Sequence, residues 1–92
     1  MRWIEVIQLR TPHSKRVRLE EELAELLEEI NRPNHHTSMR VYSREWVETD
    51  SCIVLFHDEE KTRIDGSRLG LNLVEVLKAF GMVNHSIWIE GK

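Results

Sequence analysis

The chain has one cysteine, Cys52, among its 92 residues. A single thiol excludes a disulfide framework within the chain and any zinc site that needs several cysteines. Long apolar runs are also missing, since the longest, residues 53–56, is far shorter than the ~18–20 residues that span a bilayer. We therefore expect a protein without internal disulfides and without a membrane partner.

Positive charge is not in excess either. The 13 lysines and arginines are outnumbered by 16 acidic residues, which gives a net charge of -3. Electrostatic, sequence-independent binding to the phosphates of a nucleic acid is therefore not expected, and no nucleic-acid partner is predicted. Residues 1–6 alternate polar and apolar side chains and lack the apolar stretch of a signal peptide, so the expected location is the cytoplasm.

Glycine and proline are scarce, with four and two residues, and no linker or internal repeat divides the chain. A chain of this length normally forms one domain around one core. The sequence therefore predicts a single domain over residues 1–92.

Hydrophobic periodicity gives the expected elements. Period-two patterns predict strands over residues 2–10, 38–48, 51–57 and 84–90, with a turn at 48–50. The third strand is apolar in both phases and is expected inside the sheet, covered on both faces. A 3.6-residue period predicts one helix over residues 15–30 and a second that Ser67 caps and Gly81 follows.

The resulting order, βαββαβ, predicts a ferredoxin-like α+β domain: a four-stranded antiparallel sheet with two helices on one face. Right-handed crossovers place both helices on the same face and leave the other face open. Aromatic residues are assigned to this open face, and Trp3 joins them if Ile4 and Val6 point toward the helices. The assigned residues are Trp3, Tyr42, Trp46 and Trp88. Such a face typically marks an interface or a ligand groove.

The element order and length of the whole chain resemble the dimeric α+β barrel superfamily, which includes antibiotic-biosynthesis-monooxygenase-like and haem-degrading proteins. The resemblance implies that two copies pair through their open sheet faces. The expected function is a homodimeric interaction or small-molecule-binding module, for which no cofactor is predicted. The alternative is a cofactor-free or haem-interacting monooxygenase-like enzyme, with His57 and His85 at strand ends as the candidate catalytic groups.

A third hypothesis is a metal- or anion-responsive regulatory domain. His35 and His36 are adjacent in a polar loop, and imidazole nitrogen is a common zinc or nickel ligand. Basic residues gather where the first helix begins, a position that favours anions; they are Lys15, Arg16 and Arg18.

Two features are interpreted as structural. Cys52 is expected to be a small buried side chain, without a nucleophilic role. Residues 66–70, Gly-Ser-Arg-Leu-Gly, lack a nucleotide-binding pattern and are expected to form a helix cap with a close packing contact.

Overall fold

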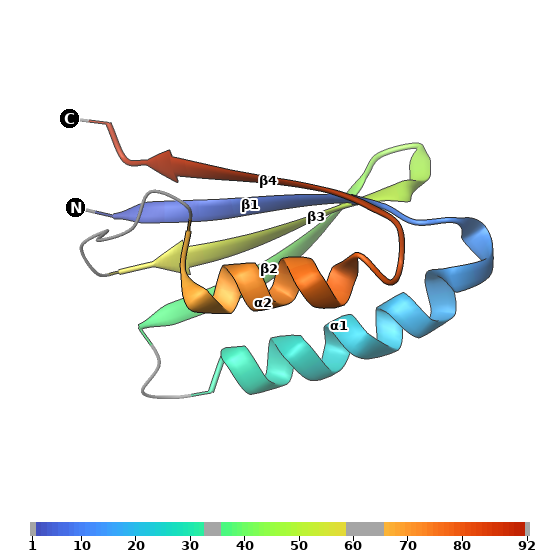
Figure 1. The fold of residues 1–92 in the computed structure, drawn as a ribbon, viewed down its shortest axis with the longest axis horizontal. Coiled ribbons are helices and arrows are strands. Elements are labelled where there is room, and N and C mark those ends of the chain that lie inside the picture. Colours follow the sequence, from blue (N-terminus) through green and yellow to red (C-terminus); the bar gives the residue numbers. More distant parts are fainter. Residues whose placement is uncertain (1, 33–35, 59–65, 92) are drawn as a thin grey trace.

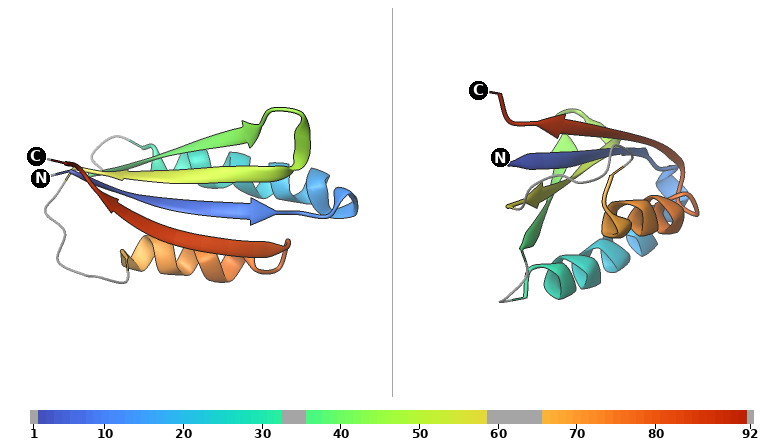
Figure 2. Two further views of the ribbon diagram at one scale, coloured as in Figure 1. Left: turned by 90° about the horizontal axis from the view of Figure 1, so that it is seen from above. Right: turned by 60° about the vertical axis from the view of Figure 1, so that its left-hand side comes forward.

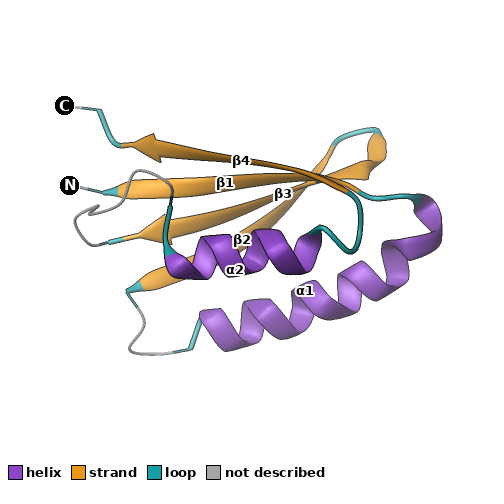
Figure 3. Cartoon of the chain, in the orientation of Figure 1, coloured by secondary structure: helices purple, strands orange, loops and turns teal. Residues whose placement is uncertain are grey.

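The computed structural model describes residues 2–32, 36–58 and 66–91. Four strands and two helices follow one another as predicted (Figures 1 and 3): β1 (Trp3–Arg10), α1 (Arg16–Ile30), β2 (Thr37–Arg44), β3 (Val47–His57), α2 (Arg68–Leu77) and β4 (Met82–Ile89). A short 3₁₀ turn, His13–Lys15, leads into α1. Neither helix is long and apolar enough to cross a membrane.

The strands form one antiparallel sheet in the order β2-β3-β1-β4. β3 lies between the two strands that α1 joins, and β1 lies between the two strands that α2 joins, so both βαβ units are split. Both helices cover the same face of the sheet, and no helix formed by the described residues lies on the opposite face (Figures 1 and 2). The predicted α+β fold with two helices on one face is confirmed.

The core lies between the helices and the sheet. The apolar stripe of each helix packs against alternate residues of the strands, as the 3.6-residue and two-residue periods require. The fully or nearly fully buried members of this cluster are Ile7, Leu9, Leu19, Leu23, Ile30, Met39, Ile53, Leu55, Leu73 and Leu77. The side chain of Asn31 closes α1 against β2 by pairing with both the backbone N–H and the C=O of Met39.

The condition under which Trp3 would lie on the open face is not met. Trp3, Ile7 and Leu9 point toward the helices and are buried, whereas Ile4 and Val6 lie on the open face. Glu5 belongs to the same buried set of alternate residues. Its carboxylate can be buried because His57 and Ser67 donate hydrogen bonds to it. Trp3 therefore belongs to the core side of the sheet and not to the open face.

The hairpin between β2 and β3 also differs from the prediction. The turn lies at Glu45 and Trp46, and β3 begins at Val47, so residues 48–50 are strand instead of turn. Trp46 has a φ of 65° and is 93% exposed. It therefore sits on the turn, outside the sheet face to which its alternation with Tyr42 and Arg44 had assigned it. β3 is interior, as expected, but only one of its faces is covered by helices.

Candidate functional site

A fully buried carboxylate lies among β1, β3, β4 and the beginning of α2. Glu5, on β1, has no exposed surface. Its Oε2 accepts hydrogen bonds from His57 Nε2 at 2.6 Å and Ser67 Oγ at 2.5 Å. Its Oε1 accepts from His85 Nε2 at 2.9 Å and from the Ser67 backbone N–H at 3.0 Å. Two donors on each oxygen satisfy the carboxylate, which is the condition for burying it.

The beginning of α2 is built around this carboxylate. Ser67 caps the helix as predicted, because its Oγ accepts the Gly70 N–H at 2.9 Å while the same hydroxyl donates to Glu5. The helix N-terminus adds a favourable partial positive charge. A Cβ at Gly70, or at Gly66 with its φ of 106°, would overlap the Glu5 carboxylate. The predicted close packing contact is therefore a contact with Glu5.

The protonation of Glu5 follows from two opposing effects. Burial, the larger single effect, raises its pKa, but hydrogen bonds from His57, Ser67 and His85 together hold the pKa below its ordinary value. Glu5 is thus ionised at neutral pH and can only accept hydrogen bonds. Nε2 of each imidazole must then carry the hydrogen, so neither Nε2 lone pair is free to ligate haem iron while these contacts persist.

His57 continues the hydrogen-bonded chain outward from Glu5. Its Nδ1 lies 2.9 Å from Thr37 Oγ1 on β2, and its ring stacks on the Trp3 indole with centroids 4.0 Å apart and an interplanar angle of 21°. A hydroxyl, an imidazole and a carboxylate are therefore linked in that order. This is the arrangement in which an imidazole can hold or pass on a proton.

The same end of the sheet borders a pocket of about 650 Å³, the end pocket, and Thr37 and His57 are among its lining residues. All four strands contribute residues to it at the end of the sheet where both chain termini lie (Figures 1 and 2). Four of the residues predicted from the sequence line it together: Trp3, His36, His57 and Trp88. His85 does not line the pocket but shares Glu5 with His57.

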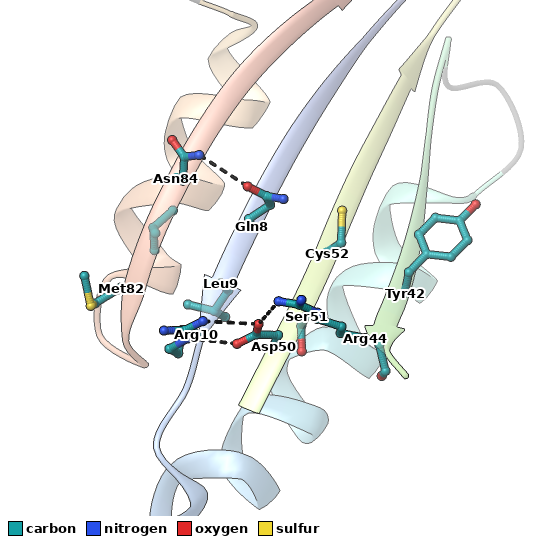
Figure 4. A pocket seen from close by; sticks show the side chains of 12 residues that line it. Gln8, Leu9, Arg10, Tyr42, Arg44, Asp50, Ser51, Cys52, Met82 and Asn84 are labelled. Atoms are coloured by element: carbon teal, nitrogen blue, oxygen red, sulfur yellow. Dashed lines mark hydrogen bonds and ion pairs between the residues drawn. The ribbon is translucent and has the colours of Figure 1, made fainter. Parts of the chain in front are cut away.

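The opposite half of the open face holds a second groove, of about 610 Å³, the polar groove (Figure 4). Arg10 and Arg44 both bind Asp50, at 2.9 and 3.2 Å, and Asn84 donates to Gln8 at 3.3 Å. The pKa of Asp50 is lowered, and the largest cause is its hydrogen bond from Arg10. Tyr42, 47% exposed, lies on this half of the face as predicted.

Cys52 lies beside these polar groups, half-buried on β3 (Figure 4). Burial raises the pKa of its thiol, which disfavours the nucleophilic thiolate. The side chain is less buried than predicted.

Among the described residues, the predicted metal and anion candidates do not converge on one site. His35 lies outside the described residues, and His36 is exposed at the end pocket. Within residues 2–32, 36–58 and 66–91 there is no group of three or more side chains placed to hold a metal ion. Lys15 donates to the Ala79 carbonyl at 3.1 Å, Arg16 pairs with Glu20 at 3.2 Å, and Arg18 is exposed.

The buried carboxylate predicts a loss of stability in acid. Because the pKa of Glu5 is lower in the folded chain than in the unfolded one, its contribution is complete above the unfolded value and declines as the pH falls through the folded value. We expect the free energy of unfolding to decrease from about pH 5 downward. Urea unfolding at a series of pH values measures this, and Glu5→Gln should show a shallower decline than the parent chain. Parallel declines would contradict the assignment to Glu5.

Comparison of the chain with protein-family models, with curated proteins and with solved structures gives no significant match. The function proposed next therefore rests on the residues of the chain itself.

Proposed function

We propose that the chain is a homodimeric small-molecule-binding module that uses the open face of its sheet. The observation that carries this proposal is an apolar patch on that face, opposite the helices. Trp88 is 58% exposed and Phe56 36% exposed, and Ile4 and Val6 lie beside them on β1. The apolar patch consists of Ile4, Val6, Val54, Phe56 and Trp88.

Two aromatic side chains of the apolar patch have polar partners within the chain. Trp88 Nε1 donates to Ser86 Oγ at 2.9 Å, which holds the indole along β4. The Arg40 guanidinium lies 5.8 Å from the centre of the Phe56 ring. Aromatic side chains bury 150–250 Å² each at about 25 cal/mol per Å², so covering them contributes several kcal/mol to association. Little of this is lost to ordering, because the side chains are already held.

A second copy of the chain is the occupant that this face fits best. A two-fold axis brings the same surface of both copies together, so the apolar patch of one copy can cover that of the other. The polar half carries both signs of charge on Arg10, Arg44 and Asp50, and can meet its counterpart through exchanged ion pairs. Face-to-face pairing also encloses the polar groove and the end pocket, whose volumes are those of small-molecule sites.

The dimer is tested with two tryptophan substitutions of equal size. Sedimentation or light scattering should give twice the chain mass of 11.0 kDa for the parent protein. Trp88→Ala removes the largest side chain of the apolar patch and should weaken dimerisation by about tenfold or more. Trp46→Ala is the matched control, because Trp46 lies on the hairpin turn, and should leave the dimer unchanged. Two results would contradict the proposal. One is a parent chain that stays monomeric at micromolar concentration, and the other is an equal effect of both substitutions on dimerisation.

A further inference from the structure

The charged and amide side chains of the polar groove lie on the same face of the sheet, the open face. Arg10 on β1 is paired with Asp50 on β3, and Gln8 on β1 is paired with Asn84 on β4. Directly paired residues of antiparallel strands extend to one side of a sheet, and so do residues two apart within a strand. One small molecule in the groove can therefore contact all four side chains (Figure 4).

Two arginines share one carboxylate in this groove. Arg10 donates to the two oxygens of Asp50 from Nε at 2.9 Å and from Nη2 at 3.4 Å, and Arg44 donates from Nη1 at 3.2 Å. A guanidinium has five N–H donors, so most donors of both arginines have no acceptor among the described hydrogen bonds. The Asp50 side chain is mostly buried, whereas both arginine side chains are about two-thirds exposed. The carboxylate thus holds both guanidiniums and leaves donors accessible from the groove.

The charge of the groove is opposite in sign to that of the chain. The charged residues among those that line it are Arg10, Arg44 and Asp50, which together carry one net positive charge. The whole chain carries a net charge of -3. An anion is therefore attracted to this part of the open face, and a carboxylate matches the planar donor pattern of a guanidinium.

The neighbouring amides provide a second, uncharged recognition site. Asn84 Nδ2 donates to Gln8 Oε1 at 3.3 Å, which leaves Gln8 Nε2 and Asn84 Oδ1 without a partner among the described hydrogen bonds. One donor group and one acceptor then lie side by side, and a primary amide complements both. Gln8 and Arg10 are two residues apart on β1, or roughly 7 Å along the strand, so the molecule that reaches both sites is short.

We infer that the polar groove binds a short aliphatic molecule with a carboxylate at one end and a primary amide at the other. The carboxylate accepts hydrogen bonds from Arg10 and Arg44, and the amide pairs with Gln8 and Asn84. This inference rests on the small-molecule part of the proposed function and adds the chemical class of the ligand.

The test uses succinamate as the probe, with neutral succinamide and butanoate as the two comparison molecules. Tyr42 is the one tyrosine of the chain and lines the groove, so fluorotyrosine labelling gives a single fluorine NMR signal that reports on this site. Succinamate at millimolar concentration should shift this signal. Succinamide lacks the negative charge and butanoate lacks the amide, so each should bind about tenfold more weakly.

Substitutions separate the two ends of the ligand. Arg44→Gln should weaken succinamate binding by about tenfold, and Arg44→Lys should restore only part of it, because an ammonium group lacks the planar donor pattern. Arg40→Gln is the matched control and should leave binding unchanged. Arg40 is an exposed arginine on the same strand, but its guanidinium lies near the Phe56 ring and it does not line the groove. Asn84→Leu should reduce the affinity for succinamate to that for butanoate and leave butanoate binding unchanged.

Three results overturn the inference. These are an unshifted tyrosine signal with succinamate at millimolar concentration, equal binding of succinamate and either comparison molecule by the parent chain, or equal losses in Arg40→Gln and Arg44→Gln. The first two need no substitution, so they hold even if a variant fails to fold. The measured mass of the same samples separates the two proposals: a dimer that does not bind succinamate overturns only the ligand, and a monomer that binds it overturns only the dimer.

Discussion

Replacing Glu5 by glutamine is expected to lower the free energy of unfolding by about 3–5 kcal/mol, the usual cost of removing one partner from a buried ionic network. The glutamine amide keeps the shape of the side chain but presents two N–H donors where a carboxylate oxygen accepts from two other donors. His57, His85 or Ser67 then loses the acceptor that the fully buried Glu5 side chain supplied. Thermal unfolding should show a decrease of roughly 4–8 °C for each kcal/mol lost.

The matched control is Glu20→Gln. Glu20 is also a glutamate paired with a basic residue, Arg16 at 3.2 Å, but its side chain is 62% exposed. Exposed pairs one helical turn apart contribute only about 0.3–0.5 kcal/mol. Equal losses for the two variants would mean that the Glu5 network adds no more than a surface pair, which would contradict the structural role assigned to it.

The fold could be predicted because its main determinants are local. The helix stripe that includes Leu19 and Leu23 allows only one face to be buried, and Ser67 marks the start of α2. The βαββαβ order then leaves few arrangements of four strands. None of these steps needs a contact between residues that are distant in the sequence.

The buried cluster could not be predicted because it depends on such contacts. Glu5 donors come from residues 52, 62 and 80 positions away. In the sequence, a glutamate within an alternating strand is typical of a solvent-facing residue, so nothing near Glu5 in the sequence indicates a buried carboxylate. The available signal was energetic: the phase of Glu5 also contains Trp3, Ile7 and Leu9, a larger apolar area than Ile4 and Val6.

The aromatic face was predicted only in part for a related reason. Tyr42 and Trp88 alternate within strands, and their faces follow from the register. Trp46 continues the same alternation by chance, because the turn begins at Glu45, three residues before the polar segment 48–50 that was predicted to form it. Periodicity predicts the side of the sheet only for residues that lie within a strand. The positions where strands end are set by the pairing of the hairpin.

Gly70→Ala is expected to lower the free energy of unfolding by about 2–4 kcal/mol, although alanine is the better helix former by about 1 kcal/mol. The new methyl group would overlap the Glu5 carboxylate, so either α2 moves or the carboxylate leaves its donors. Gly91→Ala is the control, because its Cβ would meet nothing within 4 Å, and it should be neutral in urea unfolding.

A double-mutant cycle assigns that cost to the carboxylate. In a Glu5→Ala background the overlapping group is gone, so Gly70→Ala should lose most of its cost and recover part of the helix-propensity gain. The two substitutions should therefore be strongly non-additive. Additive effects would show that Gly70 is needed for a reason other than Glu5, and that α2 is not held to the sheet through this carboxylate. Non-additivity would show that one side chain on β1 positions the start of α2.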